Sequence, residues 1–307
     1  MVNYSGPNLS TADYSRVLEV ACKEEFFKIY ESAYWKEAAY KTLCTTTSSD
    51  GDTEYYGFGG ALPLPGRIDN DSRIHYGFDD ESYTLQNYTY GLSIDIHRKV
   101  IEDDRHGFVR GKFAEAAVGH AIILESNFMD TVEAGTSATC HDSQYFFDSD
   151  HTSSQDNTDQ NQAVATADMA TTMTSALAVA QTMKAFADPN GVPLNIAPTH
   201  VLTGNGDTSV AWDMLVSTPG AVGTANAGYN PFYNRITVVK SAHAATTTEW
   251  FYLDLSKPYK PFIFQSRYGL EIKTNPPDAK SDNYVTSTYE RYRYGYGPWY
   301  LAIIGDA

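Results

Sequence analysis

The chain has 307 residues, of which 42% are hydrophobic and 20% charged, and this balance excludes wholesale disorder and predicts a substantial core. Its 22 basic and 38 acidic residues give a net charge of −16, which argues against a dedicated DNA or RNA reader, because binding to phosphate backbones needs a basic footprint. No segment approaches the roughly 20 apolar residues that span a bilayer, and the first ten residues lack the basic cluster and apolar stretch of a signal peptide.

The three cysteines predict no disulfide framework, because their number is odd and their spacing is wide. Cys22 and Cys44 flank one helical pattern, and about 22 residues of helix would hold them roughly 33 Å apart, beyond disulfide reach. With Cys140 as the third thiol, we expect reduced cysteines and a reducing cytoplasm as the compartment.

The N-terminal part predicts an arm followed by a helix. Residues 1–10 are typical of an extended arm, and apolar residues recur at helical spacing from Ser10 to about Thr42. The polar segment 45–53 predicts a break, and the glycine- and proline-rich segment 57–67 predicts irregular extended chain.

Alternating residues then predict strands. Tyr83 and Leu85 are apolar at odd positions, whereas the apolar positions after Gln86-Asn87 are even, and such a change of phase needs a turn or a bulge. The apolar residues of the second strand are Tyr88, Tyr90, Leu92, Ile94 and Ile96. We expect a long two-stranded excursion bent at this point. An isolated ribbon of this kind is marginal in water, so it needs a surface, which a neighbouring copy can supply.

Two more helices are predicted, over residues 108–133 and 161–187. The first has an apolar stripe of Phe113, Ala117, His120, Leu124 and Phe128, and Gly135 can end it. Short strands are predicted at residues 199–203, 235–239, 250–255, 261–265 and 299–304, with a helix near 208–216. Strands dispersed among helices indicate the α+β class.

No motif predicts catalysis or cofactor binding. The glycines of segment 57–60 precede a proline-rich stretch instead of a helix, which excludes a phosphate-binding loop. The chain contains no HExxH, no paired CxxC and no G-x-S-x-G. We therefore predict no catalytic, cofactor-binding or metal-binding residue, and no cofactor.

One polar segment has both a functional and a structural interpretation. His141-Asp142 and the acidic segment 148–151 contain metal-ligand types, but the EF-hand glycine and glutamate positions hold Ser153 and Asp159. A solvated acidic loop is the preferred interpretation. Cys140 beside His141 could suggest a nucleophile next to a base, but it is interpreted as a buried or inert thiol.

Three other features are also interpreted structurally. We expect His120 to be a core histidine with one satisfied partner, although a ligand role is the alternative. The carboxylates of segment 102–104 are assigned to helix N-terminal capping in preference to acid–base chemistry. The tyrosine-rich tail, with Tyr289, Tyr292, Tyr294, Tyr296 and Tyr300, is expected to form sheet and interface surface.

Four segments in register resemble the Mu-like prophage major head subunit family. They are residues 83–91 continuing to 96–98 and 101–104; residues 144–151 (QYFFDSDH); residues 250–254 (WFYLD) with Pro258, Pro261, residues 263–265 and Arg267; and residues 292–299 (YRYGYGPW). Their order and spacing agree over about residues 80–304, whereas the first 75 residues carry little resemblance.

The resemblance implies the tailed-phage major capsid fold, also called the HK-ninety-seven fold. Its parts would be an N-terminal arm and helix (1–45), an extended loop region (46–105), the spine helix of the peripheral domain (106–139), an axial domain (140–255) and return strands of the peripheral domain (256–307).

The function that the resemblance implies is that of a major capsid protein, which assembles into pentamers and hexamers of an icosahedral shell around double-stranded DNA. The implied location is the virion capsid, assembled in the host cytoplasm. The partners would be other copies of the chain, together with portal, scaffold or cement proteins. Packaged DNA would be contacted only weakly and non-specifically, and no membrane partner is expected.

Inter-subunit contacts are expected in the extended loop, at Tyr83, Leu85, Asn87, Tyr88, Tyr90 and Leu92. Three alternatives remain open at this point. They are an encapsulin-type nanocompartment shell, a metal-dependent cytoplasmic hydrolase that uses the region from His141 to His151, and a tail or decoration protein.

Overall fold

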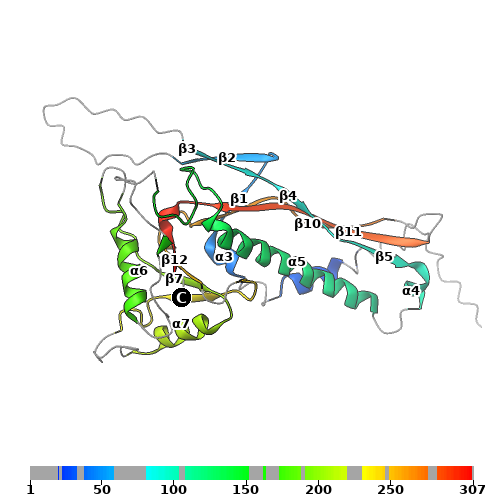
Figure 1. Cartoon of the computed structure of the whole chain (residues 1–307). Coiled ribbons are helices and arrows are strands. Elements are labelled where there is room, and N and C mark those ends of the chain that lie inside the picture. Colours follow the sequence, from blue (N-terminus) through cyan, green and yellow to red (C-terminus); the bar gives the residue numbers. More distant parts are fainter. Residues whose placement is uncertain are drawn as a thin grey trace, which may run out of the picture. The chain divides into compact units, whose positions relative to one another are not determined.

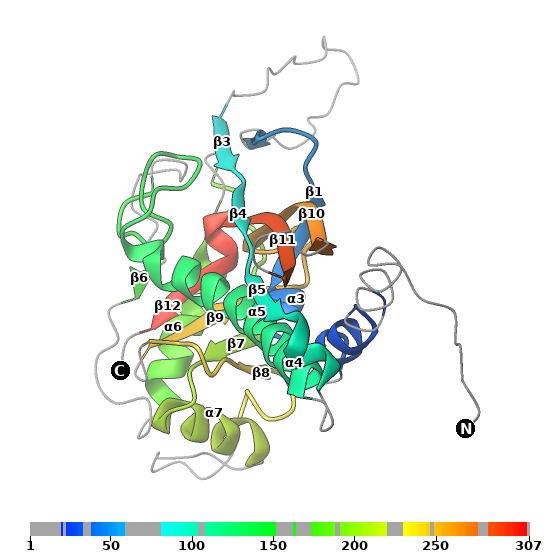
Figure 2. The ribbon, with the colours of Figure 1, turned by 90° about the vertical axis from the view of Figure 1, so that its right-hand side faces the viewer.

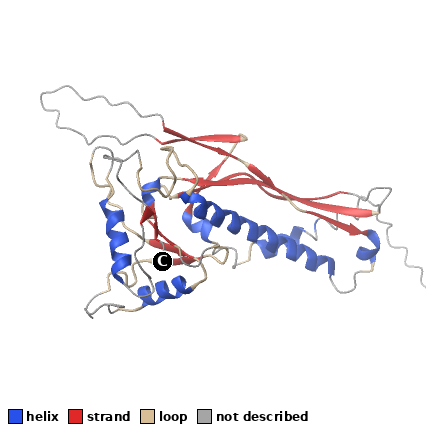
Figure 3. Ribbon diagram, in the orientation of Figure 1, coloured by secondary structure: helices blue, strands red, loops and turns tan. Residues whose placement is uncertain are grey.

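The structure is a computed structural model in which helices and strands occur in both of two units, as expected for an α+β protein (Figures 1 and 3). Unit 1 comprises residues 1–38, 87–124 and 266–293, and unit 2 comprises residues 39–86, 125–265 and 294–307. The structure describes residues 20, 23–32, 38–58, 81–103, 108–151, 162–163, 173–187, 191–219, 230–245, 249–275 and 282–305.

The predicted N-terminal helix is not continuous. Residues 23–30 are helical, but the chain turns at Glu31 and Ser32, where the Ser32 N–H donates to the Ile29 carbonyl at 3.0 Å. A second helix, α3 (Ala39–Leu43), is followed at once by strand β1 (Cys44–Ser48), so the predicted polar break at 45–53 is wrong over its first residues. Three consecutive threonines follow Cys44, and β-branched side chains favour strand. Cys22 and the arm lie outside the described residues.

The predicted change of phase at Gln86-Asn87 is confirmed, because β3 (Glu81–Gln86) ends there and β4 (Tyr88–Tyr90) begins directly afterwards. The two strands do not form a hairpin with each other. β3 pairs antiparallel with β2 (Thr53–Phe58), whereas β4 and β5 (Ser93–His97) pair antiparallel with β11 (Asn283–Tyr296). In unit 1, β4, β5 and β11 run alongside α5 (Phe108–Glu133) (Figures 1 and 2).

Helix α5 confirms the prediction at both of its ends. Its predicted stripe is buried, with exposed fractions of 5% or less at Phe113, Ala117, His120, Leu124 and Phe128. After α5, a 3₁₀ turn (Ala134–Thr136) contains Gly135, where an added Cβ would lie 2.7 Å from the Phe147 ring. This close approach explains why a residue without a side chain stands there.

The capping role assigned to segment 102–104 is wrong for the two described residues. Glu102 ends helix α4 (Arg98–Glu102), and the Asp103 N–H donates to the Lys99 carbonyl at 2.9 Å. Both residues therefore lie at the C-terminal end of a short helix, and α5 has no acidic residue in its first turn. Asp104 lies outside the described residues.

The described strands form three sheets. The first has the order β1-β10-β11-β4, with β5 also paired to β11, and β10 spans Phe262–Asn275. The second has the order β6-β12-β9-β7-β8, and the third contains only β2 and β3. The strands of the second sheet are β6 (Gln162–Ala163), β7 (His200–Thr203), β8 (Thr237–Lys240), β9 (Trp250–Leu253) and β12 (Ala302–Gly305).

The core of unit 2 is aromatic. All four residues of β9 are buried, which is typical of a strand covered on both faces. Trp250 and Tyr252 of this strand contact Trp212 of helix α7 (Asp207–Ser217), which lies beside β8 (Figure 2). Helix α6 (Met173–Ala185) lies beside β12. The prediction that this helix begins at residue 161 is wrong, because residues 162–163 form β6.

The tyrosine-rich tail forms β11, a second 3₁₀ turn (Trp299–Leu301) and β12, so the expected sheet is confirmed. Tyr292, Tyr294 and Tyr296 are 2–4% exposed, and only Tyr289, at 40%, stands well out of the surface. Most of this tail is therefore core rather than interface surface. Among the described residues, no helix is long and apolar enough to cross a membrane.

Candidate assembly ribbon and buried polar clusters

Strands β2 and β3 form a two-stranded ribbon, which is the third sheet of the structure (Figure 1). Its register pairs Tyr55 with Thr84 and Tyr56 with Tyr83. Successive residues of a strand point to opposite faces, so the neighbours Tyr55 and Tyr56 have different surroundings. Tyr55 is 75% exposed, the largest exposure among the large apolar and aromatic side chains described.

The ribbon is fastened at one place by a buried amide. Gln265 of β10 is fully buried, and its Oε1 accepts a hydrogen bond from the Tyr56 hydroxyl at 2.7 Å. Its Nε2 donates to the Leu85 carbonyl at 3.3 Å, so one side chain holds both strands. The Thr47 hydroxyl lies 2.8 Å from the Tyr56 hydroxyl and adds a third polar contact from β1.

The residues predicted to contact other subunits differ in exposure. Leu85 and Asn87 are buried within their own chain, at 4% and 5% exposure. Tyr83 and Tyr90 are half-buried; the rings of Tyr90 and Tyr292 stack at 4.5 Å. Tyr88 and Leu92, at 47% and 45%, are the exposed members of the set.

His120 is a core histidine, as predicted, but it has two partners instead of one. Its Nδ1 lies 2.9 Å from Oε1 of Glu290, and its Nε2 lies 2.7 Å from the Thr288 hydroxyl. The Thr288 hydroxyl also accepts the Leu92 N–H at 2.9 Å. Burial, and then the Glu290 charge, raise the pKa of the neighbouring Tyr30 hydroxyl well above its usual range. The network joins α5, β11 and the β4–β5 connection within unit 1.

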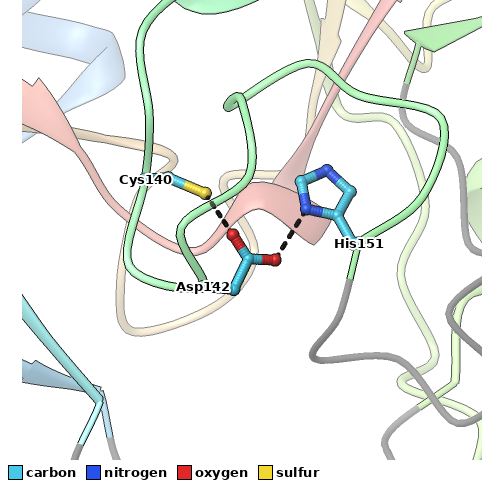
Figure 4. A group of neighbouring side chains, drawn as sticks. All are labelled: Cys140, Asp142 and His151. Carbon is cyan, nitrogen blue, oxygen red and sulfur yellow. Dashed lines mark hydrogen bonds and ion pairs between the residues drawn. The ribbon is translucent and has the colours of Figure 1, made fainter.

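The segment after α5 gathers a cysteine, an aspartate and a histidine (Figure 4). Asp142 lies between the other two: its Oδ1 accepts the Cys140 thiol at 2.9 Å, and its Oδ2 lies 2.8 Å from His151 Nδ1. The exposed fractions are 6% for Cys140, 8% for Asp142 and 0% for His151. We call these three residues the Cys–Asp–His cluster.

Local backbone geometry brings the side chains of Cys140 and Asp142 into contact. Ser143 has a φ of 66°, in the left-handed region, and a tight turn results in which the Cys140 N–H donates to the Gln144 carbonyl at 2.8 Å. The Gln144 N–H donates to Asp142 Oδ1 at 3.2 Å. His151 arrives from nine residues further on, and its ring stacks on Trp299 at 3.9 Å with 4° between the planes.

The charges of the cluster are set by these contacts. Burial raises the pKa of the Cys140 thiol well above its usual range, and the Asp142 carboxylate raises it further. Burial alone would raise the pKa of Asp142, but the hydrogen bonds from His151 and Cys140 outweigh it and hold that pKa well below its usual range. Cys140 is therefore a protonated donor, and the predicted burial of this thiol is confirmed.

The preferred interpretation of segment 141–151 as a solvated acidic loop is wrong for Asp142 and His151, which are buried. It holds for Asp150, which is exposed, whereas Asp148 is half-buried. His141, the other candidate ligand, stacks on Phe58 at 4.3 Å and is not part of the cluster. Sequence spacing gave no reason to group Cys140 with His151, because the turn at Ser143 brings Cys140 to Asp142, and His151 reaches Asp142 from nine residues further on.

A family model described as "Mu-like prophage major head subunit gpT" matches residues 16–176 and 234–306. The chain belongs to this family. It is therefore a major head subunit, the major capsid protein of a tailed phage or prophage, and its work is structural rather than enzymatic. This membership excludes the hydrolase alternative and favours a phage head over a nanocompartment shell.

The fold of this head subunit is found in solved capsids. The "Capsid structure of the Cyanophage P-SCSP1u" matches with a TM-score of 0.57 and 14% identity, covering 88% of each chain. The "Bacteriophage JBD30 capsid" matches with a TM-score of 0.54 and 13% identity, covering 90% of this chain and 67% of the other. The "Procapsid of bacteriophage JBD30" has a TM-score of 0.51, 20% identity and coverages of 95% and 75%. Among curated proteins, none matches the sequence.

Proposed function

We propose that this head subunit assembles with copies of itself into pentamers and hexamers of an icosahedral shell around double-stranded DNA, and that the β2–β3 ribbon makes contacts between subunits. The observation that carries the proposal is a two-stranded ribbon with an exposed Tyr55. Two strands alone are marginal in water, so a neighbouring chain that covers them adds stability. Rings of head-to-tail contacts then close into capsomers.

The proposal assigns a range of residues to each part of the capsid fold. The extended loop region, 46–105, contains the ribbon and the exposed Tyr88 and Leu92. The spine helix region, 106–139, contains α5, and the axial domain, 140–255, contains the aromatic core around Trp212 and Trp250. Residues 1–45 would form the arm and its helix, and 256–307 the return strands.

A cavity at the ribbon supports the proposal. It has a volume of about 360 Å³ and lies in unit 2, with Tyr56, Phe58, Tyr259, Pro298 and Tyr300 among its walls. Aromatic walls of this kind bury an apolar side chain well, and an aromatic anchor seated in a pocket is typical of subunit contacts. An apolar side chain of a neighbouring copy is the proposed occupant.

The remaining partners belong to the same proposal. Portal, scaffold or cement proteins would contact the assembled shell, and assembly would take place in the host cytoplasm. Packaged DNA would be bound weakly, because a net charge of −16 disfavours tight binding to the phosphate groups of DNA.

The experiment compares Tyr55→Ser and the pair Tyr88→Ser/Leu92→Ser with Tyr268→Ser. Tyr268 is also exposed, at 44%, but lies outside the extended loop region and serves as the matched control. Shell yield is measured by sedimentation and electron microscopy, and folding by circular dichroism and Tm. We expect the loop variants to remain folded and to lose at least about tenfold in shell yield, while the control stays near wild type.

Two outcomes would overturn the assignment. One is a normal yield of stable shells from the loop variants, and the other is an equal loss in the control. Wild-type particles that contain protein cargo and no nucleic acid would show a nanocompartment instead of a phage head.

A further inference from the structure

We propose that Cys140, Asp142 and His151 form a binding site for one divalent transition-metal ion of the Zn²⁺ type, which staples the segment after α5. The proposal is independent of shell assembly, because all three residues lie within unit 2 of a single chain. Nothing in the role of a head subunit requires it.

The donor atoms are already gathered. Sγ of Cys140, a carboxylate oxygen of Asp142 and a ring nitrogen of His151 all lie within 4.8 Å of one another, and Nδ1 is the His151 nitrogen that lies 2.8 Å from the carboxylate. Zinc binds sulfur at about 2.3 Å and nitrogen or oxygen at about 2.0–2.2 Å, which places neighbouring ligand atoms roughly 3.3–3.8 Å apart. The two hydrogen-bonded contacts, at 2.9 Å and 2.8 Å, would each need to lengthen by roughly 0.5 Å to admit the ion.

The chemistry of the set selects the ion. Thiolate and imidazole suit Zn²⁺ and related transition metals, whereas Ca²⁺ and Mg²⁺ take oxygen ligands. On binding, the thiol proton of Cys140 leaves to solvent, and His151, binding through Nδ1, carries its proton on Nε2. Thiolate and carboxylate then supply two negative charges against the two positive charges of the ion, so the loaded site is neutral. Neutrality matters because the three side chains are at most 8% exposed, and a net charge would be costly there.

The surroundings hold the ligands in place. The Gln144 N–H donates to Asp142, and the His151 ring is stacked flat on Trp299, which is 2% exposed. Outer contacts of this kind orient metal ligands and raise affinity. The second oxygen of Asp142, or a water molecule, would complete the four positions that zinc prefers.

The segment has little regular secondary structure, although Phe146 and Phe147 anchor it in the core. Between residues 137 and 151 the regular pairing consists of one isolated bridge, from Thr139 to Tyr145, with turns on either side. A metal that joins residues 140 and 151 would close this irregular stretch, as structural zinc sites do in chains with little secondary structure.

The test uses the full chain, reduced and stripped with a chelator, and titrated with Co²⁺ as a spectroscopic substitute for Zn²⁺. We expect one ion per chain with a thiolate-to-cobalt charge-transfer band, displacement by Zn²⁺, and a higher Tm when Zn²⁺ is bound. Cys140→Ser should abolish the band, and His151→Gln should weaken binding by at least about 100-fold, since loss of an outer partner alone costs 10–100-fold. Cys22→Ser and Cys44→Ser are the matched controls and should keep the band.

Three results would overturn the proposal: no band at micromolar Co²⁺, a band that is lost in a control and kept in Cys140→Ser, or a Tm that Zn²⁺ leaves unchanged. If Cys140→Ser does not fold, X-ray absorption of the zinc-loaded wild type decides. One sulfur with nitrogen and oxygen ligands supports the site, whereas oxygen ligands alone show an adventitious ion only.

Discussion

His120 on α5 and Glu290 on β11 are held 2.9 Å apart, with their side chains only 6% and 5% exposed. They are 170 residues apart in the chain. A buried pair of this kind requires both partners, because the removal of one leaves the other polar group without its bond in a place that water does not reach.

Replacing His120 with Ala is therefore expected to lower the free energy of unfolding by about 3–5 kcal/mol. Urea unfolding of the unassembled subunit measures the loss. Lys112→Ala, on the same helix, removes an ion pair to Glu115 whose side chains are 49% and 70% exposed, and it should cost no more than about 0.5 kcal/mol. Equal losses in the two variants would contradict the importance given to the buried pair.

Replacing either of two glycines of unit 1 with alanine is expected to change the stability of the subunit, in opposite directions at the two positions. At Gly91 an added Cβ would lie 2.5 Å from the Thr288 carbonyl oxygen, so Gly91→Ala should destabilise the subunit by about 1–3 kcal/mol. At Gly119, within α5, nothing lies within 4 Å of an added Cβ, so Gly119→Ala should stabilise it by about 0.5–1 kcal/mol. Thermal unfolding of both variants under one set of conditions checks the signs. A gain at Gly91 would disprove the close approach.

The stability of unit 2 should depend on pH through Glu125. Burial raises the pKa of this carboxyl above 4.5, although it accepts the backbone N–H groups of Ala39 and Tyr40. Because the folded pKa is the higher one, its contribution to stability is fully present below pH 4.5 and is lost as the pH rises through the folded pKa.

Glu125→Gln should remove this dependence, so the Tm of the variant should fall less than that of the wild type between pH 4.5 and neutrality. The quantity compared is the slope of Tm against pH in the two proteins. The other carboxylates contribute equally to both slopes, so their effect cancels. Parallel curves would show that Glu125 titrates as it does in the unfolded chain.

Gln265 should control how firmly the ribbon is held. Gln265→Met removes the bonds to Tyr56 and Leu85 and leaves their polar atoms behind, which is expected to cost about 1–3 kcal/mol. Hydrogen exchange in β2 and β3 should become faster. Gln86→Met is the control, because its bond to Asp52 is exposed, and its effect should stay within about 0.5 kcal/mol. Unchanged exchange in Gln265→Met would mean that other contacts fasten the ribbon.

Sequence patterns predicted α5 well, because its buried stripe is apolar apart from His120. For β11 they predicted only the tyrosine-rich end as sheet, although every second residue from Tyr284 to Tyr296 is buried. Thr286, Thr288 and Glu290 occupy buried positions, and these polar residues hide the alternation. Their burial is possible because partners such as His120 come from distant parts of the chain, and no local pattern contains that information.

The same reason limited the prediction of the site. The exposed Tyr88 was predicted as a contact residue, but Tyr55 was not. Gln265 lies 209 residues from Tyr56, and its local sequence does not predict their hydrogen bond. The Cys–Asp–His cluster depends on one left-handed residue, Ser143, in a segment without periodicity. Asn, Asp and Gly adopt such a conformation most readily, so a serine at this position did not predict it.

The ribbon of only two strands also bears on how shell growth starts. A subunit that contacts a single neighbour gains little binding free energy, because one contact does not offset the loss of translational and rotational entropy. Growth should therefore begin only above a threshold concentration and after a lag, and then run to completion with few partial shells. Light scattering over a dilution series would reveal that delay, and a subunit with a loosened ribbon should lengthen it.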